Sequence, residues 1–233
     1  MEWENTTNRH IAFFDIMGFK NLVQYNEHEH IVKLMTDISA IVKNMDTVKF
    51  GNNNNTVKTT IFSDSILIVS NNNSVDSAAH LMFQASYLFK KCLELHIPIK
   101  GCISYGKFTA DFEKSIFFGQ PLIDAYLLEE ELNVYSIVLH HSFESHLTGQ
   151  EYGKAIFPKN KRWIKHLTTF KNGKSNHYHL NWPFYIAEEK ISNFERQHSL
   201  LNKFYNTVSG KTRNYVDNTL ELFEKMRGSI KIN

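Results

Sequence analysis

The stretch His10-Ile-Ala-Phe-Phe-Asp-Ile-Met17 is a short apolar run that holds one acidic residue, Asp15, and ends at Gly18. Its length and its phenylalanine and isoleucine content predict a buried strand. An ionised carboxylate that is buried alone is costly, so Asp15 needs a cation or strong hydrogen-bond donors beside it. The competing interpretation is that Asp15 merely caps the helix that follows.

Outward from this strand, the pattern predicts a helix over residues 27–45 and two β-rich runs, 56–62 and 65–70, that form a hairpin around Ser63-Asp64. A second helix is expected over 74–96 and a strand over 99–105 that turns at Gly106. The order strand, helix, strand, strand, helix, strand is that of a ferredoxin-like α+β fold, an antiparallel sheet with helices on one face. We assign residues 1–187 to this domain.

The remaining predicted elements extend the core. Short β segments are expected before Gly119, then a helix that begins at Gly119-Gln-Pro121 and a strand over 135–139. From residue 188 to 233, helical spacing dominates and is broken near Ser209-Gly210. This part is therefore predicted to be a C-terminal helical extension that packs on the domain or extends a dimer.

Composition excludes several classes of protein. The 233 residues are 42% hydrophobic and 21% charged, which favours a packed core over disorder. A net charge of +2 gives no sign of nucleic-acid binding. No window approaches about 20 apolar residues, so no membrane span is predicted. Cys92 and Cys102 lie in apolar segments and are interpreted as buried free thiols of a cytoplasmic protein.

The two aspartates Asp15 and Asp64 are the candidate chemical groups. If the first strand lies beside the hairpin, both carboxylates reach one edge of the sheet. Two such oxygen ligands suit Mg²⁺ or Mn²⁺, which keep positions for water and phosphate. Backbone N–H groups around Gly18, at the entry to a helix, suit a polyphosphate. The alternative for Asp64 is an ordinary turn aspartate.

Four segments together carry a family resemblance. Phe14-Asp15-Ile16-Met17-Gly18-Phe19 resembles the opening motif of class III nucleotide cyclases, F-x-D-I-x-G-F. The others follow in the order of that family, within roughly residues 11–130: Thr59-Thr60-Ile61-Phe62-Ser63-Asp64, Ile103-Ser104-Tyr105-Gly106-Lys107 and Phe118-Gly119-Gln120-Pro121-Leu122.

The resemblance implies a reaction and its cofactors. In that family the matched aspartates, here Asp15 and Asp64, bind two Mg²⁺ or Mn²⁺ ions, with a further metal contact at Ile16. The ions hold the triphosphate, assigned here to the segment Gly18, Phe19 and Lys20, and activate the ribose 3′-hydroxyl. This hydroxyl attacks the α-phosphate and expels pyrophosphate. The resemblance also implies a homodimer whose active sites lie at the interface.

Departures from the family pattern concern the base and the missing cation. Thr60 stands where purine cyclases have Lys or Glu, and Ile116 where Asp or Cys is common; both are assigned to base binding. Ile123 and Leu127 replace the usual Asn and Arg. The positive charge that this Arg supplies in the family must therefore come from another residue. Lys107 and Lys174 are the assigned candidates, and Lys20, Lys100 and Arg162 are further candidates.

This combination resembles the stand-alone pyrimidine cyclases of bacterial Pycsar antiphage systems. The implied activity is conversion of UTP, or as second choice CTP, to the 3′,5′-cyclic nucleotide, which a separate effector protein senses during phage infection. Two alternatives stay open: a catalytically silent cyclase-fold protein that acts by interaction or dimerisation, and a purine nucleotide cyclase with unusual base contacts.

Overall fold

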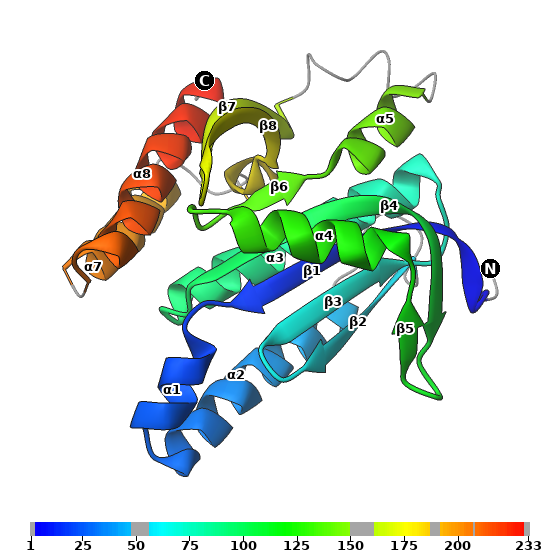
Figure 1. Cartoon of the computed structure of the whole chain (residues 1–233), viewed down its shortest axis with the longest axis horizontal. Helices are drawn as coiled ribbons and strands as arrows, with labels where there is room; N and C mark the ends of the chain where they lie inside the picture. The colour runs from blue at the N-terminus through cyan, green and yellow to red at the C-terminus, as the bar shows by residue number, and fades with distance from the viewer. Residues whose placement is uncertain (1–2, 48–55, 150–160, 187–191, 207, 231–233) are drawn as a thin grey trace.

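The computed structural model describes residues 3–47, 56–149, 161–186, 192–206 and 208–230 (Figure 1). The first half of the chain holds β1 (Thr6–Ile16), α1 (Phe19–Tyr25), α2 (His28–Thr47), β2 (Val57–Phe62), β3 (Ser65–Ser70), α3 (Val75–Glu94) and β4 (Ile99–Asp111). The second half holds β5 (Ile116–Phe118), α4 (Gln120–Glu131), β6 (Ile137–Leu139), α5 (His141–Gly149), β7 (Trp163–Phe170), β8 (Gly173–Leu180), the 3₁₀ helix η1 (Trp182–Ile186), α7 (Ser192–Tyr205) and α8 (Lys211–Ser229).

The sheet confirms the predicted α+β fold. Its strands follow the order β2-β3-β1-β4-β6-β8-β7, and β5 pairs with β4. Each neighbouring pair among the first four strands is antiparallel, and their spatial order is that of a ferredoxin-like core. Beyond β4 the sheet continues through the parallel pair β4–β6 and the hairpin β7–β8. The predicted four-stranded core is therefore extended on one side.

The helices cover both faces of the sheet, which corrects the prediction that they lie on one face. In Figure 1, α2 and α3 lie behind the central strands, whereas α4 lies in front of β1 and β4. Successive residues of β1 point to opposite faces. Because Phe13 and Phe14 are both buried, each face of β1 contributes to a core. This double burial explains why the strand is apolar almost throughout.

Strand β4 is continuous across Gly106, so the predicted turn there is wrong. The strand runs from Ile99 to Asp111, and Gly106 pairs with Arg9 in the ladder to β1. A Cβ atom at Gly106 would lie 3.0 Å from the Cγ atom of Pro121, in the first turn of α4. The glycine therefore lets α4 pack closely on the strand rather than ending it.

Helix α8 packs against strand β7 and the segment before β6. The predicted break is confirmed, since α7 ends at Tyr205 and Gly210 precedes α8. Thr219 of α8 accepts a hydrogen bond from the backbone N–H of Tyr135 through its Oγ1, at 2.9 Å. The predicted domain boundary between residues 187 and 188 lies outside the described residues. Among the helices that the structure describes, none has the length and apolar character needed to cross a membrane.

Two fully buried histidines predict acid sensitivity of the fold. Ser136 Oγ lies 2.8 Å from Nδ1 of His179 and Thr168 Oγ1 lies 2.6 Å from its Nε2. Burial lowers the pKa values of His10 and His179 to about 3. The unfolded chain binds these protons near pH 6.5, whereas the folded chain binds them only near pH 3, so unfolding takes up protons between these limits.

We therefore expect the free energy of unfolding to fall as the pH falls below about 6.5, by up to about 1.4 kcal/mol per pH unit for each histidine. Urea unfolding at pH 7, 6 and 5 measures this slope. Replacing His179 with glutamine should make the slope shallower, whereas His28→Gln, on an exposed helix end, should leave it unchanged. An equal slope in His179→Gln and the unaltered chain would contradict the assignment.

Candidate functional site

The structure brings Asp15 and Asp64 together at one edge of the sheet. Asp15 lies near the end of β1, in register with Ser65 of β3 and with Lys100 of β4. Asp64 lies in the β2–β3 turn, and its backbone carbonyl accepts a hydrogen bond from the N–H of Ile16 at 2.9 Å. This hydrogen bond holds the β2–β3 turn beside the end of β1, the strand that carries Asp15.

The electrostatics of this edge fit a cation. Burial and the neighbouring Asp64 carboxylate raise the pKa of Asp15, and Lys100 only partly opposes them. Among the described residues, no group of three or more His, Cys, Asp or Glu side chains could hold a metal ion. Magnesium is commonly held by one or two carboxylates plus substrate phosphates and water. Asp15 and Asp64 fit that pattern, and the predicted contact at Ile16 would come from its backbone.

A buried ion pair stands directly beside Asp15. The Nζ atom of Lys100 lies 3.1 Å from Oε1 of Glu129, and both side chains are at most 5% exposed. Lys100 also donates to three backbone carbonyls at the end of α4, those of Glu129 (2.9 Å), Glu130 (3.3 Å) and Leu132 (3.3 Å). Burial raises the pKa of Glu129 to about 7, against the opposing effect of Lys100.

Lys100 therefore supplies the positive charge that lies closest in the sheet ladder to Asp15. The sequence pattern offers Lys100 only as one of several candidate cations and does not single out Glu129. The signal that could have found Lys100 is the one that found Asp15: a charged residue inside an apolar strand. Helix α8 adds Tyr215, whose ring centroid lies 6.0 Å from Lys100 Nζ. Nothing in the sequence around Tyr215 indicated this position.

The predicted triphosphate segment begins one residue after Met17, which directly follows the end of β1 at Ile16. Gly18 has a left-handed backbone (φ 76°) and precedes α1, and Phe19 and Lys20 are the first residues of that helix. A positive φ favours glycine at this position. The segment thus lies next to Asp15, and its binding role stays a prediction.

The two predicted base-binding residues lie in different parts of the chain. Thr60 of β2 stands opposite Leu67 of β3, near the Asp64 turn. Ile116 begins β5 and pairs with Asp111 at the far end of β4, and it is 43% exposed. The strand register therefore does not place Thr60 and Ile116 side by side within one chain.

The two assigned candidate cations lie away from Asp15 in the strand register. Lys107 is exposed and pairs with Asn8, seven positions along β4 from Lys100. Lys174 is exposed in β8, opposite Thr169. Its neighbour in the same hairpin, Lys171, forms an ion pair of 3.2 Å with Glu130 near the end of α4. The structure thus favours Lys100 over Lys107 and Lys174 as the local cation.

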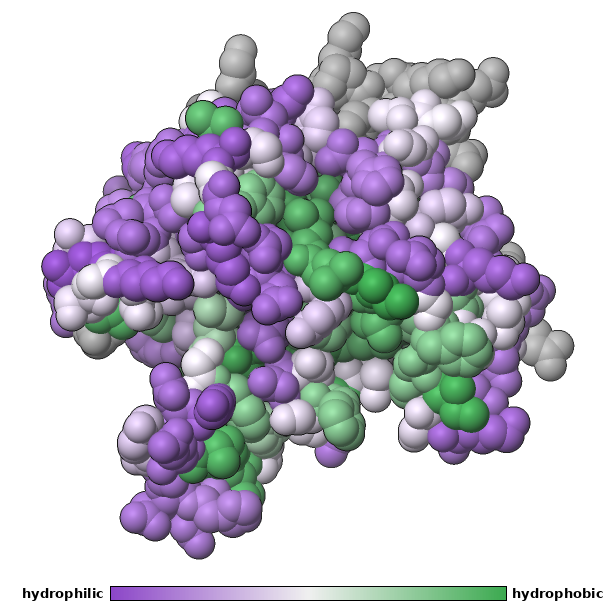
Figure 2. Space-filling view, viewed as in Figure 1, coloured by the Kyte–Doolittle hydropathy of each residue, from purple (hydrophilic) through white to green (hydrophobic). Residues whose placement is uncertain are grey.

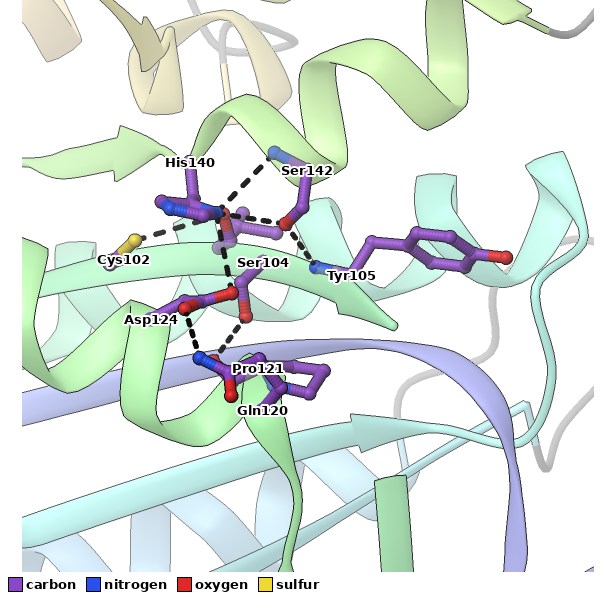
Figure 3. A network of polar contacts seen from close by, with 9 residues as sticks. Cys102, Ser104, Tyr105, Gln120, Pro121, Asp124, His140 and Ser142 are labelled. Carbon is purple, nitrogen blue, oxygen red and sulfur yellow. Dashed lines mark hydrogen bonds and ion pairs between the residues drawn. The ribbon is translucent and has the colours of Figure 1, made fainter. Parts of the chain in front are cut away.

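A second polar network fixes the beginning of α4 to β4 and α5 (Figure 3). Nδ1 of His140 lies 2.9 Å from Ser142 Oγ and 3.9 Å from Asp124 Oδ2. Ser142 Oγ also accepts the N–H of Tyr105 at 3.0 Å. Serine and aspartate meet the same imidazole nitrogen, whereas a catalytic triad uses opposite nitrogens. We therefore interpret this network as a structural link.

Comparisons with known proteins concern the fold. No protein-family model matches the sequence, and no curated protein matches it. Among solved structures, the chain is similar to the catalytic core of a rhodopsin-guanylyl cyclase with converted specificity, determined in complex with ATPαS. That likeness has 16% identity and a TM-score of 0.49, over 77% of this chain and 98% of that chain.

A second solved structure is a class III adenylyl cyclase-like ATP-binding protein from Pseudomonas aeruginosa. It shows 12% identity and a TM-score of 0.40, over 60% of this chain. This chain spans only 35% of the length of that protein.

Proposed function

We propose that the chain is a nucleotide cyclase that converts UTP, or CTP as the second choice, to the 3′,5′-cyclic nucleotide and pyrophosphate. The observation that carries this proposal is the meeting of Asp15 and Asp64 at one sheet edge, with the Ile16 N–H bonded to the Asp64 carbonyl. Burial, and after it the Asp64 carboxylate, raise the pKa of Asp15, which supports a close approach of the two carboxylates. Such a pair suits divalent cations that also bind phosphate.

The reaction uses few groups of this chain. Asp15, Asp64 and the backbone at Ile16 would hold two Mg²⁺ or Mn²⁺ ions, which supply charge stabilisation for the attacking and leaving oxygens. Gly18, Phe19 and Lys20 would position the triphosphate beside them. The ribose 3′-oxygen forms a bond to the α-phosphorus, the bond to the bridging oxygen breaks, pyrophosphate leaves, and the hydroxyl proton passes to water. Lys100 holds a fixed positive charge next to Asp15.

The choice of a pyrimidine rests on the residues at the proposed base-reading positions. Thr60 has a hydroxyl that both donates and accepts hydrogen bonds, which suits the edge of uracil or cytosine. Ile116 offers neither the acid nor the thiol that is common in purine cyclases. In a homodimer, Thr60 and Ile116 of one subunit would face the substrate that Asp15 and Asp64 of the other subunit hold through the metal ions.

A competition assay tests the base choice. Purified chain is incubated with equal amounts of ATP, GTP, CTP and UTP and with Mn²⁺, and the cyclic products are identified by mass. We expect cyclic UMP as the main product and cyclic CMP as the second. Cyclic AMP or cyclic GMP as the main product would overturn the pyrimidine assignment.

An exposed apolar surface supports the proposed homodimer. On α4, the outward side chains Ile123, Tyr126 and Leu127 are 52%, 48% and 54% exposed. Phe118 of β5 and Phe62 beside the Asp64 turn are 61% and 82% exposed. Figure 2 shows hydrophobic residues gathered over α4 and β5 on this face of the molecule. Exposed apolar surface of this kind marks interaction sites, and a second copy of the chain is the proposed occupant.

We expect Leu127→Glu to convert the dimer to a monomer and to reduce turnover with it, because the charge would be desolvated at the interface. Light scattering after size-exclusion chromatography gives the mass. Leu95→Glu, at a 44% exposed leucine at the end of α3, is the matched control and should stay dimeric. A dimer of unchanged stability in Leu127→Glu would contradict this interface.

The resemblance to pyrimidine cyclases of antiphage systems supports a signalling role for the product. We infer that the cyclic nucleotide is a second messenger in the cytoplasm and that a separate effector protein senses it. A bacterial strain that expresses the chain without that effector should accumulate the cyclic nucleotide during phage infection without growth arrest.

A further inference from the structure

A cavity of about 520 Å³ lies between the segment that follows β1 and the C-terminal helices α7 and α8. Met17 and Gly18, which directly follow the metal strand, line one side, and Phe204 of α7 with Thr212 and Tyr215 of α8 line another. Binding sites for small molecules commonly have volumes of about 300–1,000 Å³. The cavity is thus large enough for a small ligand, and Met17 and Gly18 of its wall follow Asp15 closely in the chain.

Aromatic rings from separate elements line this cavity. The rings of Tyr135 and Tyr215 are stacked, with centroids 5.5 Å apart and planes 22° apart. Phe204 lies 6.1 Å from Tyr135 and 6.1 Å from His96, centroid to centroid. These rings pack on one another and form one aromatic wall of the cavity, which favours a flat ligand that can stack on that wall.

His96 has a strained backbone at the rim of the cavity. Its φ is 59°, and it ends α3 in a pattern in which Ile97 N–H bonds to the Cys92 carbonyl (2.8 Å) and His96 N–H to the Leu93 carbonyl (3.1 Å). Glycine is the usual residue at this position of such a helix end. A histidine there is unfavourable for the fold, and its exposed imidazole lines both this cavity and a neighbouring one of about 450 Å³.

We propose that this cavity binds a flat heteroaromatic ring that carries hydrogen-bonding or anionic groups, of the kind found in a nucleotide. Tyr135, Tyr215 and Phe204 would contact the ring, and His96 and Lys203, which also lines the cavity, would contact its polar groups. The ring has two possible sources: the base of the substrate itself, or a second nucleotide that acts as an effector. The substrate source rests on the proposed function and would replace its assignment of the base to Thr60 and Ile116, whereas the effector source leaves that assignment unchanged.

Filling the cavity tests the proposal. UMP is titrated calorimetrically in the presence of EDTA, so that binding depends neither on metal nor on turnover. Thr212→Trp places a large side chain at an exposed position of α8 that lines the cavity. Thr36→Trp is the matched control, on an exposed face of α2 that lines a separate groove. We expect UMP to bind at least tenfold more weakly to Thr212→Trp than to the unaltered chain or to Thr36→Trp.

A second variant separates binding from folding. Because His96 has a left-handed backbone, which favours glycine, His96→Gly should raise the melting temperature by about 2–4 °C. The same variant should bind UMP several-fold more weakly. A gain in stability together with a loss of binding is not expected of a purely structural residue. Unchanged UMP affinity in His96→Gly would contradict the proposed contact between the His96 imidazole and the ligand.

The KM for UTP distinguishes the two sources of the ring. If the ring is the base of the substrate, Thr212→Trp raises the KM for UTP at least tenfold; if it belongs to an effector, that KM is unchanged while UMP binding is lost. Equal UMP affinity in the three proteins, or no binding to the unaltered chain at millimolar UMP, would overturn the proposal. Asp64→Asn, which should be inactive as a cyclase, should still bind UMP. The binding result therefore does not depend on whether the chain has cyclase activity.

Discussion

Asp64→Asn is expected to reduce cyclic nucleotide formation by about a thousandfold or more, because a missing metal ligand removes several kcal/mol of charge stabilisation and each 1.36 kcal/mol is tenfold in rate. Asp15→Asn should have the same effect. Single-turnover assays with UTP and Mn²⁺ measure the rate. Asp76→Asn, an exposed aspartate in the first turn of α3, is the matched control and should keep full activity.

Asp15→Asn should at the same time stabilise the fold in the absence of metal. Burial and Asp64 raise the pKa of Asp15, so its ionised form is less favourable in the folded chain than in the unfolded one at neutral pH. The neutral amide removes this cost. Thermal unfolding with EDTA should therefore show a higher melting temperature for Asp15→Asn. A variant that loses both stability and activity would contradict a functional role and favour a structural one.

The second large effect concerns the buried ion pair next to Asp15. Lys100→Met leaves the Glu129 carboxyl buried without its partner and frees three carbonyls at the end of α4. Breaking a buried pair from one side typically destabilises by about 3–5 kcal/mol, and we expect a loss of that size in urea unfolding at pH 8. At pH 5 the loss should be smaller, because the pKa of Glu129, about 7 even beside Lys100, leaves it protonated there.

A double variant separates the two roles of Lys100. Lys100→Met with Glu129→Leu replaces both charges by apolar groups and should recover most of the lost stability. We expect turnover to be low in Lys100→Met and equally low in the double variant, since both lack the positive charge beside Asp15. Full recovery of turnover in the double variant would show that Lys100 acts only through packing.

The features that the sequence predicted depend on local pattern. The hairpin 57–70 is set by alternating β-rich runs around Ser63-Asp64, and Asp15 stands out as a charge within an apolar strand. The order strand, helix, strand, strand, helix, strand predicts the ferredoxin-like core, and Asp15 and Asp64 are predicted to meet if the first strand lies beside the hairpin, as it does.

The features that the sequence did not predict depend on contacts between distant segments. The partner of Lys100 is Glu129, 29 residues away, and Tyr215 reaches the same place from α8. A turn was predicted at Gly106 because glycine usually interrupts strands, but here the glycine makes room for Pro121. The C-terminal helices carry only an apolar stripe, which predicts that they pack but not that they line a cavity together with Met17 and Gly18.

One measurement tests the central claim most directly. Purified chain is incubated with UTP and Mn²⁺, and the nucleotide product is weighed by mass spectrometry while pyrophosphate is measured in parallel. The account predicts 3′,5′-cyclic UMP and pyrophosphate in equal amounts, and neither product from Asp64→Asn. Absence of any cyclic nucleotide from UTP or CTP, or equal production by Asp64→Asn, would contradict it.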